Sequence, residues 1–246
     1  MKSLLNIIFC VAVVAFQEGR SKRVKRLSGS VYIEPHRFPY NVFIKYLEKP
    51  RCGGALVDEQ HLITAAHCFC HGGGEPISDL NNFTIVAGSK DLADPKSGIT
   101  TGVKRVVKEP FRLSDSIKPI KLPVPYQEYC VGTLLAITGY GSETPGGPYS
   151  NYLKLSLTNI ISQEQCKELM PDSHLGSATL CTKSRDESRV CDYDNGSPLV
   201  NTFTKLGKVI VGLLSIGDPD SCVESPDIYT KVSHHLDFIR TGILSM

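Results

Sequence analysis

Apolar and polar residues follow three different patterns along the chain of 246 residues. An apolar run from Leu4 to Phe16 has about the length of the hydrophobic region of a signal peptide and is too short to span a bilayer. After it, glycine and proline are scattered rather than clustered, which favours many short strands joined by turns. Near the end, Leu236, Ile239 and Ile243 recur at intervals of three and four residues, which predicts a helix with one buried face. The pattern predicts an all-β protein that ends in a short helix.

The first 26 residues are expected to be removed from the mature protein. Residues 1–15 are interpreted as a signal peptide that ends at the small residue Ala15. A buried core helix or a membrane anchor is the alternative, and the polar, basic segment that follows the apolar run argues against both. Residues 16–26 form a basic propeptide with a dibasic site, and cleavage after Arg26 would make Leu27 the first residue.

The charge balance argues against a nucleic-acid partner. The chain has 27 Lys and Arg against 25 Asp and Glu. Residues 1–26 hold six of the basic residues and one of the acidic ones, so 21 basic and 24 acidic residues remain. A mildly acidic mature chain does not carry the basic excess that is typical of nucleic-acid-binding proteins. No CxxC pair indicates structural zinc, and we expect neither a metal nor a cofactor.

Cysteine usage favours an oxidising compartment. Eight cysteines follow the signal peptide, an even number that suits the disulfide framework of a secreted protein. Their spacing alone does not give the connectivity. The sequon that begins at Asn82 adds a candidate N-glycosylation site, provided that it lies on a surface loop. We therefore expect the protein to be extracellular.

Several short motifs follow one another along the chain. One is the segment Leu62–Cys68, which reads LITAAHC. The others are CGGAL from Cys52, Gly139-Tyr140-Gly141, residues 191–198, Ser215-Ile216-Gly217 and residues 229–233. In kind and order these motifs resemble those of the trypsin and chymotrypsin family of serine proteases, with LITAAHC in the place of the active-site histidine motif. The resemblance covers nearly all of residues 27–246. It implies one trypsin-like domain of two packed antiparallel β-barrels, with the first at about residues 27–135 and the second, with the helix, at 136–246.

The resemblance also implies most of the disulfide framework. Three cysteine pairs correspond to pairs of the family, and the two remaining cysteines are assigned to each other by elimination. The family-like pairs are Cys52–Cys68, Cys166–Cys181 and Cys191–Cys222, and the remaining pair is Cys70–Cys130.

The catalytic residues of the family are only partly present. Amide hydrolysis on this scaffold needs a nucleophilic oxygen, a base, a carboxylate that orients the base, and donors for the oxyanion. The resemblance assigns the base to His67, but where the family has Gly-Asp-Ser-Gly-Gly-Pro the chain reads Tyr-Asp-Asn-Gly-Ser-Pro, so Asn195 stands at the nucleophile position. A carboxamide has no nucleophilic form near neutral pH. Ser197 would need a different turn to meet His67, and we expect it to be a small surface or turn residue.

Two further parts of the catalytic machinery are altered. Tyr193 stands where the family has an oxyanion-hole glycine, and its side chain would strain or flip the backbone and fill the cleft, or else turn to solvent. The strand with the catalytic aspartate, on the order of ten residues, is missing before Leu113, and Asp115 matches a later, non-catalytic aspartate. The first barrel is therefore expected to lack one strand, either genuinely or through exon skipping or a faulty gene model.

The specificity pocket is changed as well. The resemblance places Ser215 and Gly217 in this pocket and Arg189 at its base, where trypsins that cut after Lys or Arg have aspartate. A cation there would repel basic side chains and could accept an acidic one, or it could fold back onto a neighbour such as Asp192.

The activation device of the family is retained. Asp194 matches the aspartate that pairs with the new α-amine after cleavage, which here would be the amine of Leu27. An ammonium buried against a carboxylate could order the loops of the second barrel. A surface role for Asp194 is the alternative.

These features favour a secreted, non-catalytic homologue of the serine proteases that binds or regulates another secreted protein. The partner would be a protease, a protease inhibitor or an immune or secretory factor, with neither nucleic acid nor a membrane involved. One alternative is a trypsin-like endopeptidase of which this sequence is a defective variant or gene model. Another is a structural component of a secretion.

Overall fold

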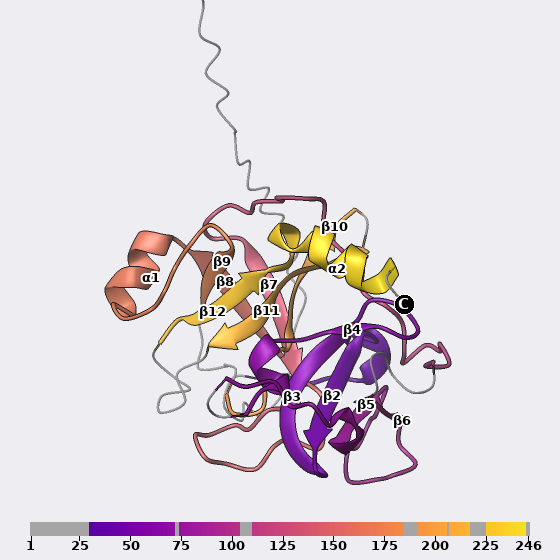
Figure 1. Cartoon of the computed structure of the whole chain (residues 1–246). Helices are drawn as coiled ribbons and strands as arrows, with labels where there is room; N and C mark the ends of the chain where they lie inside the picture. Colours follow the sequence, from indigo (N-terminus) through magenta and orange to yellow (C-terminus); the bar gives the residue numbers. More distant parts are fainter. Residues whose placement is uncertain are drawn as a thin grey trace, which may run out of the picture.

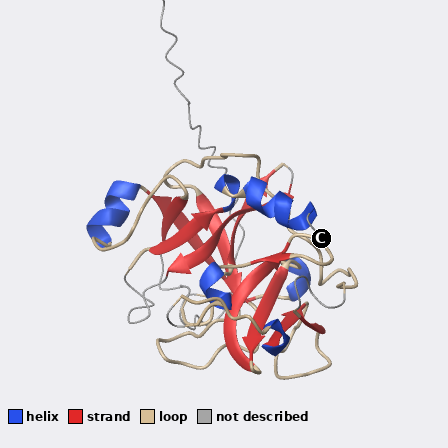
Figure 2. Ribbon diagram, in the orientation of Figure 1, coloured by secondary structure: helices blue, strands red, loops and turns tan. Residues whose placement is uncertain are grey.

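The computed structural model of the chain describes residues 30–71, 74–103, 110–184, 191–205, 207–216 and 225–244. Two antiparallel sheets, one in each half of the chain, form most of the molecule, and short helices lie around them (Figures 1 and 2). The predicted signal peptide, propeptide and cleavage site, with Arg26 and Leu27, lie outside the described residues. None of the described helices is long and apolar enough to cross a membrane.

The second sheet closes into a barrel of six strands. Its order is β8-β7-β10-β11-β12-β9, and β9 pairs back with β8. The strands are β7 Leu134–Gly139, β8 Lys154–Ile161, β9 Thr179–Ser184, β10 Pro198–Thr204, β11 Gly207–Ile216 and β12 Asp227–Lys231. Closure removes the exposed edges that an open sheet would leave.

The first described strand, β1 (Val31–Tyr32), pairs with the second barrel, although its residues belong to the segment expected in the first. Tyr32 lies opposite Lys154, at the beginning of β8. β9 pairs only with the later part of β8, from Thr158 onward, so the beginning of β8 can bond β1 on that side. β1 therefore adds an edge strand to the second sheet, and the expected boundary near residue 135 stays a prediction.

The first sheet has five strands in the order β4-β3-β2-β5-β6. They are β2 Asn41–Tyr46, β3 Lys49–Leu56, β4 Leu62–Ile63, β5 Phe83–Ala87 and β6 Ile99–Gly102. Within the described part of the chain β4 and β6 do not pair with each other, so the sheet is a half-barrel. The expected fold, a trypsin-like pair of barrels with an incomplete first one, is confirmed.

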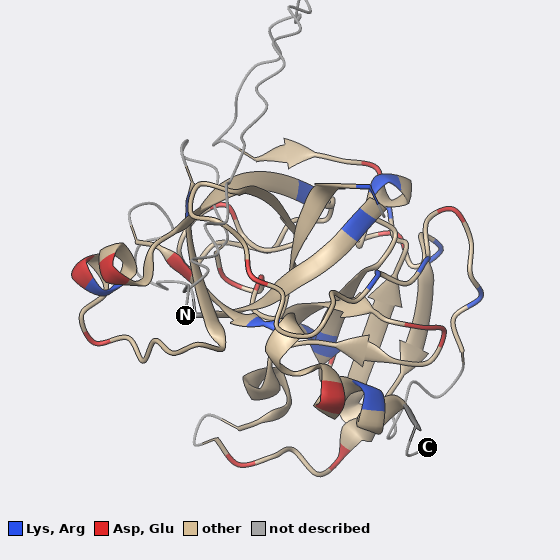
Figure 3. Cartoon of the chain, turned by 90° about the horizontal axis from the view of Figure 1, so that it is seen from above, with Lys and Arg blue, Asp and Glu red and all other residues tan. Residues whose placement is uncertain are grey.

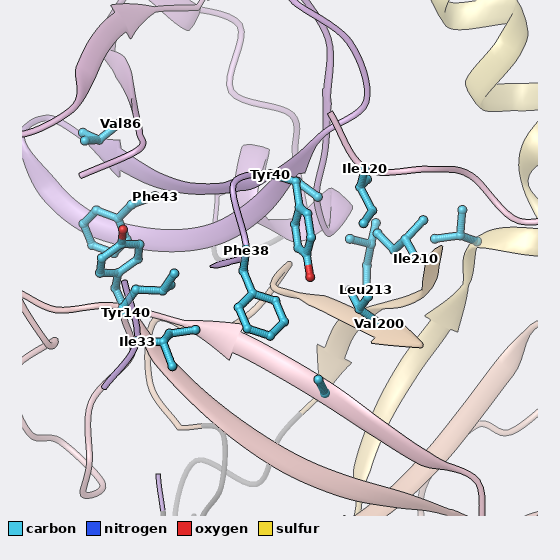
Figure 4. Packing of buried hydrophobic residues seen from close by; sticks show 14 of the residues in the cluster. Ile33, Phe38, Tyr40, Phe43, Val86, Ile120, Tyr140, Val200, Ile210 and Leu213 are labelled. Atoms are coloured by element: carbon cyan, nitrogen blue, oxygen red, sulfur yellow. The ribbon is translucent and has the colours of Figure 1, made fainter. Parts of the chain in front are cut away.

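One buried apolar cluster joins the two barrels (Figure 4). It contains Tyr40 and Phe43 from the first half of the chain and Val200 and Ile210 from β10 and β11. The ring of Phe43 lies 5.7 Å from that of Tyr140, which follows β7. Burial of such large side chains holds the barrels together and so fixes the positions of site residues that come from both.

The C-terminal helix α2 (Leu236–Leu244) confirms the predicted apolar period, with Leu236 and Ile239 buried. A second helix, α1 (Gln163–Leu169), was not predicted. The residue that could have predicted its start from the sequence is Ser162. The Ser162 hydroxyl caps the helix by accepting a hydrogen bond from the Gln165 N–H at 3.1 Å. Four 3-10 turns complete the described helices: η1 Pro35–Arg37, η2 Ala66–Phe69, η3 Leu80–Asn82 and η4 Val232–His234.

Two of the predicted disulfides are formed, Cys52–Cys68 and Cys166–Cys181. The predicted Cys70–Cys130 pair is wrong, because Cys70 is a free thiol. Cys70 follows η2 beside the first sheet, whereas Cys130 lies just before β7 of the second barrel and is itself disulfide-bonded. Cys191 is also disulfide-bonded, and Cys222 lies outside the described residues, so their pairing stays a prediction.

The free thiol can be tested by alkylation. Because Cys70 is partly exposed, unreduced native protein is expected to be alkylated at Cys70. Peptide mapping by mass spectrometry measures this modification, and Cys130, which reacts only after reduction, is the internal control. Stoichiometric alkylation of Cys130 without reduction would contradict the assignment.

The sequon residue Asn82 ends η3 and is half-buried. Its side-chain amide donates to the Asp79 carboxylate at 3.1 Å. Glycosylation at Asn82 stays a prediction.

Candidate functional site

His67 lies in η2, which is fastened to β3 in two ways. The Cys52–Cys68 disulfide joins the strand to the residue after His67. Arg51, the neighbour of Cys52, donates from Nε to the Cys68 carbonyl at 2.9 Å and from Nη2 to the Cys70 carbonyl. A guanidinium satisfies the carbonyls that a helical turn leaves unpaired at its end. Arg51 is therefore a positioning residue for this turn, which the sequence analysis missed.

The electrostatic surroundings of His67 differ from those of a catalytic base. Partial burial, followed by the nearby Arg51 cation, lowers the pKa of the imidazole. Among the residues that the structure describes, no carboxylate is paired with the ring. A paired carboxylate would raise the pKa and hold one tautomer. His67 is thus a neutral imidazole at physiological pH, and no carboxylate of the described residues orients it.

Asn195 lies in the turn between Cys191 and β10, against the first barrel. Its carbonyl accepts a hydrogen bond from the Gly53 N–H of β3 at 2.8 Å. The next residue, Gly196, has φ +78° and donates to the Leu214 carbonyl at 2.8 Å. A Cβ on Gly196 would lie 2.0 Å from Thr64 Oγ1, so only glycine fits this left-handed position. The turn is thereby held beside β3 and the segment before His67.

Tyr193 adopts a left-handed backbone conformation, which glycine tolerates better than other residues. Its φ is +71°, a left-handed value that costs a non-glycine residue about 1–2 kcal/mol. Its ring is half-buried and packs edge-on against Tyr149, with the ring centres 6.4 Å apart. Tyr149 in turn stacks on Phe43 at 5.5 Å. Of the two expectations, strain is confirmed, and the ring lies against an aromatic cluster rather than turning fully to solvent.

Ser197 and Asp115, which the sequence analysis set apart from the catalytic residues, lie in opposite surroundings, one buried and one exposed. Of the expected surface or turn position, the turn is confirmed and the surface is wrong, because the Ser197 N–H donates to the Asp194 carbonyl at 2.9 Å and the residue is only 1% exposed. A Cβ on Gly53 would lie 2.2 Å from its hydroxyl oxygen, so the hydroxyl is packed against the barrel junction. Asp115 is highly exposed and pairs with Lys118 at 2.8 Å. Its non-catalytic assignment agrees with this position.

Asp194 is buried, so the surface alternative is wrong. It is 5% exposed, and one carboxylate oxygen accepts from the Gly141 N–H at 2.8 Å. The other accepts from the Cys191 N–H at 3.2 Å. Its carboxylate thus joins its own turn to the segment that follows β7.

A cavity of about 860 Å³ lies beside His67, on the open side of the half-barrel. β4 contributes Leu62 and Ile63 to its walls, and α2 contributes Phe238 and Ile239. Ser215 of β11 also lines it, so the structure brings this predicted pocket residue to the same space as His67. The other two predicted pocket residues, Arg189 and Gly217, lie outside the described residues.

One cluster of potential metal ligands occurs among the described residues, and it does not suit a metal. Cys52, Cys68 and His67 place their ligand atoms within 4.8 Å of one another. Both sulfurs are committed to the Cys52–Cys68 disulfide, and thiolates rather than disulfides bind metals. This cluster therefore gives no support to a metal centre.

Comparison with known proteins places this geometry in a family. The family model described as Trypsin matches residues 28–239. The serine protease SP24D of Anopheles gambiae is 25% identical over 231 residues, which cover 88% of this chain and 80% of the relative. Phenoloxidase-activating factor 1 of Holotrichia diomphalia is 25% identical over an alignment of 247 positions, gaps included. This alignment covers 85% of this chain and 67% of the relative.

A solved structure has the same fold. Human heparin binding protein superimposes with a TM-score of 0.73 at 24% identity, covering 89% of this chain and 97% of that one. Since the family model spans most of the 246 residues and the two barrels agree with it, the chain belongs to the trypsin family.

Proposed function

We propose that this protein is a secreted, non-catalytic member of the trypsin family that acts by binding another secreted protein. The observation that carries the proposal is Asn195 at the nucleophile position of a turn that is packed tightly onto β3. A carboxamide cannot attack a peptide carbonyl. The imidazole of His67, which pairs with no carboxylate in the described part of the chain, and the tyrosine at position 193 support the same conclusion, because each removes a separate part of the catalysis.

The charges favour a protein partner over a polyanion. In the view of Figure 3, ribbon segments of acidic and of basic residues are interspersed along the described chain rather than separated by sign. Heparin binding protein is named for a polyanion, and a polyanion requires a concentrated basic surface. We place the contact at the cavity beside His67, where the Phe238 side chain is 80% exposed. Exposed aromatic side chains at the rim of an apolar depression are typical of protein interfaces.

The loss of catalysis is tested with a fluorophosphonate probe, which labels activated serines. Wild-type protein, both uncut and cut after Arg26, is expected to remain unlabelled. An active trypsin under identical conditions is the positive control, and labelling of the chain at Ser197 or any other serine would refute the assignment.

The binding role is tested by affinity capture from the native fluid followed by affinity measurement on the captured protein. Phe238→Glu is expected to weaken binding at least about tenfold, since it places a charge in the apolar contact. Phe203→Glu is the matched control, because Phe203 in β10 is 72% exposed but does not line the cavity. Equal affinities of both variants and wild type would place the interface elsewhere, and the absence of any specific partner would remove the binding role.

A further inference from the structure

The buried carboxylate of Asp194 lies in a space that two glycines leave open. A Cβ on Gly139 would lie 2.1 Å from one carboxylate oxygen, and a Cβ on Gly141 would lie 2.2 Å from the other. Both glycines belong to the segment where β7 ends. Two backbone N–H groups bond the carboxylate, but hydrogen bonds from neutral donors compensate only part of the cost of burying a charge.

A buried lysine reaches the same segment from β8. Lys154 lies directly opposite Gly139 in the β7–β8 register. Only 7% of its side chain is exposed. Its ammonium donates to the Ser142 carbonyl at 3.3 Å and lies 4.0 Å from Glu143. The segment of residues 139–142 therefore contacts the Asp194 carboxylate through Gly139 and Gly141, and it receives the lysine side chain opposite Gly139 and at the Ser142 carbonyl.

The two charged groups act on each other through this segment. Desolvation raises the pKa of Asp194 to about 6, and the field of Lys154 opposes that rise. Desolvation lowers the pKa of Lys154, and Asp194 is the first group to oppose it. The interaction is favourable for both charged forms, and it acts at low dielectric, where charges interact strongly.

We infer that Lys154 is a built-in counter-charge for Asp194 that holds the turn of residues 191–196 in its present shape without any cleavage of the chain. In the family pattern this cation would be the α-amine that is released by cutting, here at Leu27. The lysine supplies one positive charge to the same carboxylate from within the barrel. The turn with Tyr193 and Asn195 is therefore preformed in the uncut chain, and cleavage after Arg26 is not its switch.

The other charged and titratable groups around the pair do not supply this cation. Asp192 is the next residue but one and raises the pKa of Asp194. Tyr229 is buried, and Asp194 raises its pKa further. Glu143 faces Lys154 and accepts a hydrogen bond from the Tyr32 hydroxyl at 2.9 Å. Of the described charged groups that act on Asp194, Lys154 is thus the cation.

The sign of the pH dependence follows from the Asp194 pKa. Because this pKa is higher in the folded state than its ordinary value of 3.8, the folded protein binds the proton more tightly, and stability falls as pH rises from about 4 to beyond 6. Removing Lys154 raises the folded pKa further. A Lys154 variant is therefore expected to lose little stability at pH 5, where Asp194 is protonated. It loses more stability at pH 8, where Asp194 must ionise.

The first experiment measures Tm of the full chain at pH 5 and pH 8. Lys154→Met and Lys154→Gln are both expected to lose at least about 4 °C more at pH 8 than at pH 5. The glutamine lacks the positive charge but can still donate to the Ser142 carbonyl, so this variant separates the effect of the charge from the effect of the hydrogen bond. Lys231→Met is the matched control, because Lys231 is also buried but pairs with Glu128 at 2.7 Å. When the Lys154 substitutions are made in Asp194→Asn protein, the additional decrease of Tm at pH 8 should disappear.

The second experiment compares amide hydrogen exchange of peptides covering residues 191–197. Uncut Arg26→Gln protein and protein cut at Leu27 are expected to show equal protection. Lys154→Met in the uncut chain should exchange at least about tenfold faster there. The inference is overturned if cutting the wild type slows exchange in the turn, or if the Lys154 variants lose the same Tm at both pH values.

Discussion

Replacement of Gly139 by alanine is expected to lower the free energy of unfolding by about 3 kcal/mol. The added Cβ would lie 2.1 Å from an Asp194 carboxylate oxygen and 2.9 Å from the Ser197 hydroxyl. Both side chains are buried, with 5% and 1% exposure, so neither can move into solvent without opening the junction. To relieve the clash, Asp194 would have to give up its bond to the Gly141 N–H and leave buried polar groups unpaired.

Urea denaturation measures this loss, and Gly176→Ala is the control. A Cβ on Gly176 meets no atom within 4 Å, and Gly176 is not among the glycines with positive φ. Its substitution should change stability by no more than about 0.5 kcal/mol. A Gly139→Ala protein within about 1 kcal/mol of wild type would mean that the Asp194 carboxylate has room to move, which the tight packing at Gly139 and Gly141 argues against.

The elements with a strong local signal were predictable. α2 follows from the spacing of Leu236 and Ile239, because one buried face requires an apolar residue at every turn of the helix. The half-barrel follows from the shortened segment before Leu113, since a sheet cannot close without its strand. The positions of His67 and Asn195 follow from motifs whose surroundings are set by contacts of Gly53 and Gly196, which allow few other residues.

The elements that tertiary contacts decide were not predictable. β8 is the clearest example, because its polar residues Lys154, Ser156 and Thr158 are buried while Leu157 is 43% exposed. Ordinary alternation would place the leucines inside. The register instead sets Lys154 opposite Gly139, on the side where the Asp194 carboxylate is buried.

The pairing of cysteines by elimination failed for a similar reason. Elimination assumes that every cysteine has a partner, and it contains no information on distance. Cys70 is placed by Arg51, which bonds its carbonyl and keeps it in the turn after His67. The local sequence around Cys130 does not indicate in which barrel its disulfide partner lies.

Restoring the nucleophile alone, by Asn195→Ser, is expected not to produce a working protease. The new hydroxyl would face His67, whose pKa is lowered by desolvation and Arg51 rather than raised by a carboxylate. Loss of the orienting carboxylate costs roughly ten-thousandfold on a Ser-His-Asp scaffold. The strained Tyr193, at an oxyanion-donor position, adds a penalty that overlaps with the first, because members of a catalytic unit do not contribute additively. Turnover should therefore stay at least about ten-thousandfold below that of an active trypsin.

Two assays measure this deficit. One is labelling by a fluorophosphonate probe, and the other is hydrolysis of ester and peptide substrates with Lys, Arg, Asp or Phe at the cleavage position. Asn195→Ser with His67→Ala is the matched control, since any residual labelling that depends on the imidazole disappears in it. The Asp91 and Asp94 carboxylates accept backbone N–H groups of their own loop, each at 2.9 Å, and are not poised to replace the missing aspartate. Stoichiometric, His67-dependent labelling of Asn195→Ser would mean that a carboxylate does reach the imidazole. It would contradict the proposal that more than the nucleophile is lost from the catalytic site.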